Sequence, residues 1–386
     1  MDVVTLTQEL IKRQSITPNE CGIYAIIQSQ LADFSVIKCD KLGVKNIFLY
    51  KDFSNDSATH NAKNIKAKHN IKKPHICFAG HIDVVPAGEN WSVNPFGAEI
   101  KDNILYGRGT QDMKGGVAAI VCALKETKQF NGILSLLLTS DEEGDGIYGT
   151  KIVLDALKKR DLLPDFAIVA EPTCKNILGD SIKIGRRGSI NGILKIFGTQ
   201  GHVAYPQKCL NPIDLIAPIL SKISSFDLDS GDDFFAPSKI VITDIRAGME
   251  VTNVTPSDLK LMFNVRNSPQ TDKNTIEKYI ESLLKKANIT NYHLSFSQSS
   301  FPFLCDSSIL LESLTSAIIS QTKIKPLPNT DGGTSDARYF SAFGVEVVEF
   351  GLVNDKIHAI DECVKISDLR LLKDIFVEFL RHFTRG

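Results

Sequence analysis

Short apolar runs alternate with segments of helical spacing along most of this chain, and this alternation constrains the fold more than any other feature. The pattern is clearest between residues 75 and 185, and it resumes after Phe301. Such an order is typical of an α/β layer with a mostly parallel sheet, because the helical segments fit crossover connections between buried strands. The expected strands are Asn46–Tyr50, His75–Ala79, Ile133–Thr139, Phe166–Ala170 and Val345–Gly351, and the expected helices are Val3–Lys12, Gly115–Lys128, Lys151–Lys159, Ser308–Ser320, Ser335–Phe343 and Ile366–Phe383.

The order of elements changes between residues 186 and 298, where it becomes strand, helix, strand, strand, helix, strand. This is the ferredoxin-like order. Asn211 is a favourable N-cap, and Pro212 suits the first position of the first helix. We therefore expect a discontinuous catalytic α/β domain, residues 1–185 and 299–386, with an inserted α+β domain at 186–298 that acts as a lid and in dimerisation. The expected elements of the insertion are Ile190–Phe197, Pro212–Ser225, Lys239–Ile245, Leu259–Val265, Thr275–Ala287 and Tyr292–Phe296.

Composition excludes several classes of function. The formal net charge is −1, and no long basic run is present, so a nucleic-acid partner is not expected. No apolar run approaches the roughly 20 residues that cross a bilayer, and the first residues do not resemble a signal peptide. The eight cysteines are too widely spaced for a Cys-x-x-Cys zinc site or a small disulfide framework. We expect a cytoplasmic protein.

Metal-binding residue types follow the predicted strands. In open α/β sheets, ligands bind outside the carboxyl ends of the strands, so these side chains should meet at one edge. Asp112 is interpreted in the same way, as a residue after a strand at Ile104–Thr110. The residues concerned are His81, Asp83, Asp112, Glu142, Glu143, Glu171 and His358.

Histidines and carboxylates without thiolates suit zinc, cobalt or manganese, with zinc as the first choice. A set this rich in carboxylates can hold two cations, and converging carboxylates repel one another unless a cation compensates them. Taken alone, Asp141–Gly144 is more typical of a solvated turn, and it is the convergence that favours a metal centre. His60 and His69 lie in the polar Lys51–Lys73 segment and are expected to be exposed loop residues rather than ligands.

Four sequence blocks resemble the metal-binding blocks of the dinuclear metal amidohydrolases, a family that includes deacetylases, aminoacylases and carboxypeptidases. Four further blocks narrow the resemblance to the desuccinylase branch of that family. The first four are His81–Pro86, Gly107–Gly115, Thr139–Gly144 and Ala170–Pro172, and the further four are Gly185–Ser189, Gln200–Pro206, Gly332–Asp336 and Asn354–His358. Small departures occur at Ala170, Thr252 and Asn267, where the branch usually has other residues, and they bear on specificity rather than on chemistry.

The resemblance assigns a role to each candidate residue. Asp112 bridges two divalent cations, and the peptide bond after it is cis. His81 and Glu171 complete one cation site, and Glu143 and His358 complete the other. Asp83 orients the imidazole of His81, Glu142 is the general base, and His202 reaches the active site of the partner subunit in a homodimer. The substrate-binding residues implied are Arg186, Ser189, Asn253, Arg266, Gly333, Thr334 and Asn354.

The implied reaction is hydrolysis of N-succinyl-LL-2,6-diaminopimelate to succinate and LL-2,6-diaminopimelate, a step of lysine and diaminopimelate biosynthesis. Arg186 and Arg266 are suited to bind carboxylates, which the substrate carries on both halves. Two alternatives stay open: another deacylase of the family, acetylornithine deacetylase first, and a metal-free binding protein on the same fold. A nucleotide-dependent oxidoreductase is set aside, because no P-loop motif occurs, and the spacing Gly144-x-Gly146-x-x-Gly149 directly follows Glu142 and Glu143, which the resemblance assigns to the metal centre.

Overall fold

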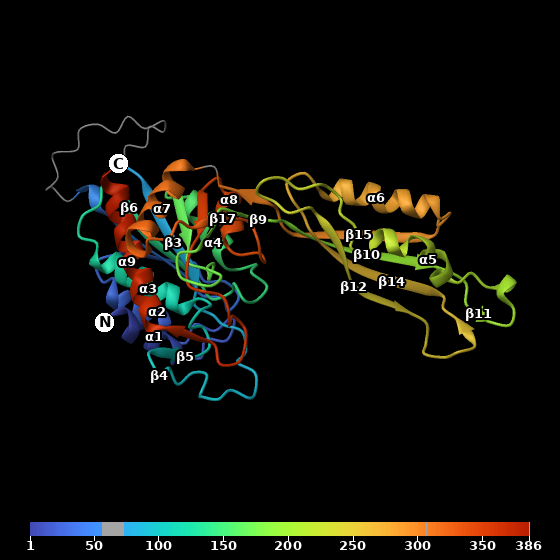
Figure 1. Ribbon diagram of the computed structural model, residues 1–386, viewed down its shortest axis with the longest axis horizontal. Coiled ribbons are helices and arrows are strands. Elements are labelled where there is room, and N and C mark those ends of the chain that lie inside the picture. The colour runs from blue at the N-terminus through green and yellow to red at the C-terminus, as the bar shows by residue number, and fades with distance from the viewer. Residues whose placement is uncertain (56–72, 306, 386) are drawn as a thin grey trace. The chain divides into compact units, whose positions relative to one another are not determined.

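The structure of this protein, a computed structural model, describes residues 1–55, 73–305 and 307–385 (Figure 1). The expectation for His60 and His69 falls outside the described residues. The chain divides into two compact units. The first comprises Met1–Gly185, Cys305–Asn329 and Ser335–Gly386, and the second comprises Arg186–Leu304 and Thr330–Thr334.

The second unit extends beyond the predicted limit at residue 298. Its last long strand, β15 (Tyr292–Ser300), pairs with β10 (Ser189–Phe197) as far as Ser300, so the chain stays with this unit up to Leu304. The apolar pattern of the strand ends at Phe296, whereas its backbone pairing continues through the polar residues that follow. The sequence limit was therefore placed too early.

The first unit is built on an eight-stranded mixed sheet in the order β1-β2-β6-β3-β7-β18-β8-β17. Its central strands β6, β3, β7 and β18 are mutually parallel, while the pairs β1–β2, β2–β6 and β18–β8 are antiparallel. The predicted α/β class with a mostly parallel sheet is confirmed. The strands are β1 (Ser35–Lys38), β2 (Asn46–Asp52), β3 (His75–His81), β6 (Ile133–Thr139), β7 (Phe166–Val169), β8 (Ser181–Lys183), β17 (Leu327–Asn329) and β18 (Glu346–Glu349).

The helices of the first unit form two groups. Helices α1, α2, α3, α7 and α9 pack on one another, and α4 and α8 pack together, with both groups also contacting the sheet. Their bounds are α1 (Val3–Ile11), α2 (Ile23–Gln30), α3 (Lys114–Glu126), α4 (Thr150–Lys158), α7 (Ser308–Thr322), α8 (Ala337–Ala342) and α9 (Ile366–Arg385). The predicted helix at Ser335–Phe343 is present as α8, which begins two residues later and ends one residue earlier than predicted.

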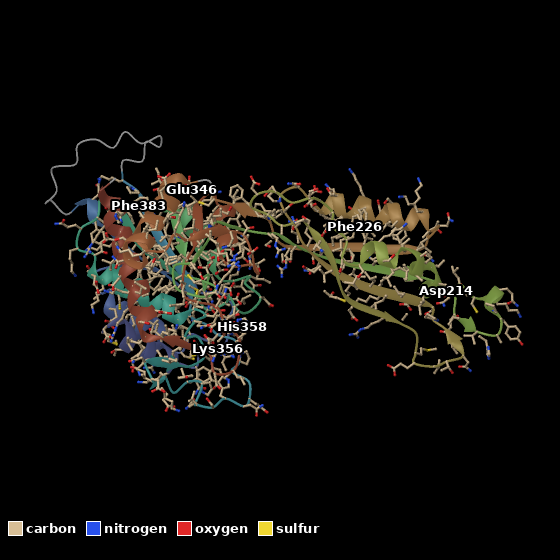
Figure 2. The ribbon with its side chains drawn as sticks, in the orientation of Figure 1. Asp214, Phe226, Glu346, Lys356, His358 and Phe383 are labelled. Carbon is tan, nitrogen blue, oxygen red and sulfur yellow. The ribbon has the colours of Figure 1, made fainter. Side chains whose placement is uncertain are left out.

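The C-terminal helix α9 supports the strand that carries the first metal-ligand candidate. Phe376 and Phe379 pack edge-to-face on Phe78 of β3, with ring centroids 5.2 and 6.2 Å apart. Phe383, labelled in Figure 2, lies near the end of the same helix. It packs on Phe166 of β7 with ring centroids 5.3 Å apart. Aromatic pairs of this kind contribute about 0.5–1.5 kcal/mol each beyond area burial, so they fix β3 and β7 against the helix layer.

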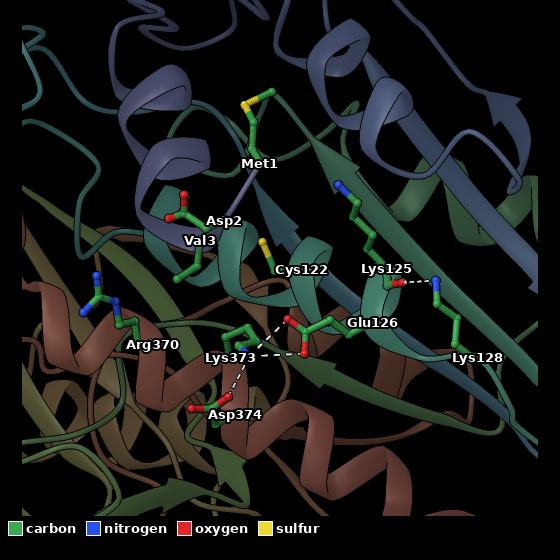
Figure 3. A pocket seen from close by; sticks show the side chains of 10 residues that line it. All are labelled: Met1, Asp2, Val3, Cys122, Lys125, Glu126, Lys128, Arg370, Lys373 and Asp374. Atoms are coloured by element: carbon green, nitrogen blue, oxygen red, sulfur yellow. Dashed lines mark hydrogen bonds and ion pairs between the residues drawn. The ribbon is translucent and has the colours of Figure 1, made fainter.

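A surface pocket in the first unit is bordered by α1, α3 and α9 (Figure 3). Inside it Lys373 pairs with Glu126 and Asp374 at 3.1 and 2.7 Å. None of its lining residues is a metal-ligand or substrate-binding candidate. They are Met1, Asp2, Val3, Cys122, Lys125, Glu126, Lys128, Arg370, Lys373 and Asp374.

The second unit has a four-stranded antiparallel sheet in the order β12-β14-β10-β15, with α5 and α6 packed on it. Alternate residues of its strands point into one core: Leu194 of β10 lies opposite Leu261 of β14, and both are fully buried. The strand order is the ferredoxin-like arrangement. Its main elements are β10, α5 (Pro212–Ile223), β12 (Lys239–Ala247), β14 (Asp258–Arg266), α6 (Lys273–Lys286) and β15.

Shorter elements complete the described residues, in which no helix has the length and apolar character needed to cross a membrane. A three-stranded antiparallel sheet of the first unit has the order β19-β5-β4. The remaining bounds are β4 (Glu99–Lys101), β5 (Ile104–Tyr106), β9 (Gly185–Arg186), β11 (Gly201–His202), β13 (Val254–Thr255), β16 (Phe303–Leu304), β19 (Cys363–Lys365), and the 3₁₀ turns η1 (Phe53–Asn55) and η2 (Pro206–Lys208).

Candidate metal centre

Most of the expected ligands stand at one edge of the large sheet. β6, β3 and β7 are adjacent parallel strands, so their carboxyl ends reach the same edge. His81 is the last residue of β3, Glu142 and Glu143 follow β6, and Glu171 follows β7. His358 lies in the loop between β18 and β19 (Figure 2).

Asp112 is placed beside these residues by a turn, and not by the end of a strand of the large sheet as predicted. The strand before it, β5, ends at Tyr106 and belongs to the separate three-stranded sheet. Asp112 instead lies in the turn just before α3, and its peptide bond to Met113 is cis, as the resemblance predicted. Placing Asp112 at the end of a strand of the main sheet was wrong, because a short apolar run does not specify which sheet it joins.

The carboxylate of Asp112 lies between the two imidazoles. Its Oδ1 is 3.2 Å from Nε2 of His81, and its Oδ2 is 3.3 Å from Nε2 of His358. His358 Nε2 is also 3.0 Å from Oε1 of Glu143. On the other side, His81 Nε2 is 3.9 Å from Oε1 of Glu171 and 4.0 Å from Oε2 of Glu142. One carboxylate facing two imidazoles with its two oxygens is an arrangement that suits a ligand shared by two cations.

The imidazole of His81 is oriented by a backbone carbonyl. Its Nδ1 lies 2.9 Å from the carbonyl of Asp83, which can only accept, so Nδ1 carries a proton and Nε2 is the nitrogen that faces the cluster and could bind a metal. The carboxylate of Asp83 is farther away, with Oδ1 at 3.6 Å from Nδ1. That carboxylate accepts the backbone N–H groups of Glu142 and Glu143 at 3.4 and 3.1 Å. Asp83 thus ties the turn after β6 to the end of β3.

Burial and mutual repulsion raise the pKa values of two carboxyl groups in this cluster. Burial raises the pKa of Glu142 to about 8, and the charges of Asp336 and Asp112 add to the effect. Burial, with Asp112 and Glu142 adding, also raises the pKa of Glu171 well above its ordinary value. Hydrogen bonds to Asp112 and Glu143 raise the pKa of His358 to about 10. The cluster therefore retains protons at neutral pH, which marks a strongly negative environment for any cation.

A buried oxygen of Glu171 tests whether the cluster fits a metal. Oε1 of Glu171 is inaccessible to solvent and accepts no hydrogen bond from any residue that the structure describes. An unpaired buried carboxylate oxygen is costly, and a cation is the group that would compensate it. One ligand atom each from His81, Asp112 and Glu143 lies within 4.8 Å of the others, and the same holds for His81, Glu142 and Glu171. The donor set fits divalent cations.

The substrate-binding candidates are divided between the two units. Asn354 belongs to the first unit, where its backbone N–H donates to Cys174 O at 3.0 Å. The others belong to the second unit. There Arg186 Nη1 donates to the carbonyl of Gly333 at 3.0 Å, and Oγ of the buried Ser189 accepts from Asn264 at 3.1 Å. Burial and the charge of Arg187 lower the pKa of Arg266.

Thr334 is half-buried and follows Gly333 in the turn that joins the second unit to α8. Asn253 is exposed and accepts from Val203 N through its carbonyl at 3.1 Å. His202 ends β11, which pairs with β13. Its Nδ1 accepts the N–H of Ala204 at 3.0 Å, and its ring lies 6.0 Å from that of Tyr205. The binding roles of all these residues stay predictions.

Comparison with known protein families decides which family this chain is part of. The model of peptidase family M20/M25/M40 matches residues 77–382, which include all seven acidic and histidine residues predicted for the metal centre. The chain belongs to peptidase family M20/M25/M40. A "succinyl-diaminopimelate desuccinylase" of Helicobacter pylori (strain Shi470) is 52% identical over 386 residues and covers all of both chains. One of the same name from Aliarcobacter butzleri is 50% identical and covers 99% of this chain and 100% of its own.

Solved structures of the M20 family share the fold. A "dinuclear metal binding peptidase from M20 family" of Bacillus subtilis superposes with a TM-score of 0.69 and 14% sequence identity. The match covers 98% of this chain and 96% of that one. At this identity the likeness concerns the M20 fold alone.

Two buried charged residues of this M20 chain were not among the site residues predicted from sequence. Arg108 was noted only as part of a block, and Glu362 was not considered. Nη1 of Arg108 donates to Glu362 Oε2 at 2.7 Å, and both side chains are almost inaccessible to solvent. A glutamate four residues after His358 offers no periodic or motif signal, but a charged residue between two short apolar stretches could have been flagged as a candidate for a buried ion pair.

Proposed function

We propose that this M20 chain hydrolyses the amide bond of N-succinyl-LL-2,6-diaminopimelate, releasing succinate and LL-2,6-diaminopimelate with the help of two divalent cations. The observation that carries the proposal is the 52% identity, over the full length of both chains, to a relative named succinyl-diaminopimelate desuccinylase. The cluster of His81, Asp112 and Glu143 supports it, because its donors suit divalent cations.

The donors divide into two sets around Asp112. His81 and Glu171 would hold one cation, Glu143 and His358 the other, with Asp112 between them. Nitrogen and carboxylate ligands without thiolates make zinc the first choice, with cobalt or manganese as alternatives in one site. When bound, the cations would compensate the buried carboxylates and polarise the scissile carbonyl.

Glu142 is positioned to handle protons. Its Oε2 lies 4.0 Å from Nε2 of His81, so it stands on the His81 side of Asp112. Burial raises the pKa of its carboxyl group to about 8. A carboxyl group in this position can take a proton from the attacking water and later donate it to the leaving amine. The backbone N–H groups of Glu142 and Glu143 donate to Asp83 and so fix the backbone of the turn that carries this side chain.

The second unit is proposed to recognise the substrate. Arg186 and Arg266 would bind carboxylates, which the proposed substrate carries on its succinyl arm and on its amino-acid half. His202 is proposed to act in the active site of the partner subunit. Its Nδ1 accepts the N–H of Ala204, so Nε2 carries the proton and can donate to a developing oxyanion.

A homodimer is proposed as well, because His202 can reach a partner's active site only if two copies of the chain associate. β12 is the outermost strand of its sheet and exposes Val241 and Ile245, and Met249 and Val251 are exposed just beyond its end. An outer strand with apolar side chains is a natural surface for pairing with a second copy. Sedimentation at micromolar concentration tests this, and an active monomer would contradict the assignment of His202.

The deciding experiment compares N-succinyl-LL-2,6-diaminopimelate with N-acetylornithine, each with and without added zinc. We expect a higher kcat/KM for the succinyl substrate and loss of activity after chelation. The variant Arg266→Ala should raise KM for the succinyl substrate, because the carboxylate loses its partner. A higher kcat/KM for N-acetylornithine would assign the chain to the deacetylases of the family. A chelator-resistant activity would contradict the metal chemistry itself.

A further inference from the structure

The buried pair Arg108–Glu362 lies next to the cluster but contributes no atom to it. Neither residue was assigned a role by the sequence, and the pair connects two segments that each carry a proposed ligand. Glu362 is completely inaccessible to solvent, and Arg108 is 2% exposed. Removing two charges from water is costly unless the pair serves other groups as well.

The carboxylate of Glu362 organises the turn that presents Asp112. Its Oε1 accepts the backbone N–H of Gln111 at 2.8 Å and that of Asp112 at 3.1 Å. Its Oε2 accepts the N–H of Gly109 at 3.0 Å. Three N–H groups of one turn thus point at a single carboxylate, and the direction of the Asp112 backbone depends on it.

Arg108 extends the same network to the other imidazole. Besides the 2.7 Å contact of its Nη1 with Glu362, its Nη2 donates to the carbonyl of His358 at 3.3 Å and to that of Ala87 at 3.3 Å. The ring of Trp91 covers the guanidinium group at 5.2 Å. The planar guanidinium is therefore fixed, and it relates the backbone of His358 to the carboxylate that holds Asp112.

We propose that Glu362 and Arg108 are positioning residues that set the placement of Asp112 relative to His358, and through it the affinity of this chain for divalent cations. Asp112 Oδ2 and His358 Nε2 are 3.3 Å apart, and each backbone is held by one member of the pair. Groups that orient metal ligands typically change metal affinity by about 10–100-fold when they are substituted. The inference rests on the proposed metal centre.

Two substitutions test the pair. Glu362→Gln keeps the size of the side chain, but its amide NH₂ faces backbone N–H donors or Arg108, so at least one of the three N–H bonds is lost. Arg108→Lys keeps the charge, but one ammonium group cannot reproduce the planar fork that spans Glu362 and the carbonyls of His358 and Ala87. Asp229→Asn is the matched control: Asp229 accepts from Gly231 N and Ser238 N and from two hydroxyl groups, and it lies in the second unit.

The measurement is a titration of metal-free full-length protein with Co²⁺, followed by calorimetry and by the visible absorption of the bound ion. We expect Glu362→Gln to bind Co²⁺ at least tenfold more weakly and with an altered spectrum. Arg108→Lys should chiefly weaken the site that includes His358. Asp229→Asn should bind as the wild type does, even if it unfolds at a lower temperature. At saturating Co²⁺ the KM of Glu362→Gln should stay near the wild-type value, because neither member of the pair is among the proposed substrate-binding residues.

Four results would overturn the inference. If Glu362→Gln bound Co²⁺ with the wild-type affinity and spectrum, the pair would have only a structural role. If Asp229→Asn lost as much Co²⁺ affinity as Glu362→Gln, the loss would reflect general destabilisation. If Glu362→Gln does not fold, wild-type affinity in Arg108→Lys has the same force. Wild-type protein that binds no Co²⁺ would overturn the proposed metal centre and this inference together, whereas normal wild-type binding with an unaffected variant would refute the inference alone.

Discussion

Nε2 of His358 lies 3.0 Å from Oε1 of Glu143, although 215 positions separate the two residues. His358 belongs to a loop near the end of the chain, and Glu143 follows a central strand of the sheet. The same imidazole nitrogen is 3.3 Å from Asp112, which comes from a third segment. The half-exposed His358 therefore lies where three segments of the chain meet. Substituting the side chains of this region one at a time distinguishes their roles.

Replacing Glu143 by Gln should weaken metal retention. The amide is a poorer metal ligand than the carboxylate, and its NH₂ group cannot accept the imidazole contact. We expect the variant to lose roughly tenfold or more in affinity for one of two cations, in line with the usual effect of altering a metal site. Metal content after dialysis against a weak chelator measures this. Full retention of both ions would remove Glu143 from the ligand set.

Replacing Glu142 by Gln should have the opposite signature. Both metals should remain bound, while kcat falls by about 10²–10⁴-fold, because the amide cannot take up the proton of the attacking water. Metal analysis and steady-state kinetics on the same preparation separate the two effects. Identical behaviour of the Glu142 and Glu143 variants would show that base and ligand have been assigned incorrectly within this pair.

His75 should make the free energy of unfolding depend on pH. Burial lowers its pKa from 6.5 to about 4, so between these pH values the unfolded chain takes up a proton that the folded chain does not. The stabilising contribution is complete above pH 6.5 and is lost as the pH falls towards 4, by up to about 3 kcal/mol.

Urea unfolding of metal-free protein at pH 7 and pH 4.5 measures the effect, with His75→Gln as the comparison. The ring of His75 contacts Ser135 at 2.8 Å, and a glutamine can keep a polar contact there without titrating. The loss of stability on acidification should be smaller in the variant. Equal losses in both proteins would show that His75 is already protonated, or accessible, in the folded state.

Gly351 should not tolerate a side chain. A Cβ atom at this position would lie 2.5 Å from the backbone oxygens of both Ala170 and Glu171, and backbone atoms cannot move aside cheaply. Gly351→Ala should lower the free energy of unfolding by about 1–3 kcal/mol, the usual range for overpacking. Because Glu171 is displaced as well, metal retention should fall. An unchanged urea midpoint would mean that the β7 and β18 ends are less tightly packed than described.

Much of the fold follows from local pattern. Ile133–Thr139 is a strand with the same limits as predicted, and the order of elements in the second unit was predicted correctly, since a strand and a helix bury side chains with different periods. Boundaries that depend on pairing were less accurate. β15 continues to Ser300 through polar residues that carry no apolar signal, and α8 begins at Ala337, two residues after the predicted start.

The sequence by itself determined which residue types follow the strands. Because adjacent parallel strands end at the same edge of a sheet, it also determined that His81 and Glu171 would be neighbours. It did not determine how Asp112 arrives, because β5 pairs in a different sheet and the carboxylate is oriented by contacts made far along the chain. Only the tertiary structure places Glu362 under that turn. The bonds of Glu362 join residues about 250 positions apart, and no local periodicity records a contact whose partners meet only after the whole unit has folded.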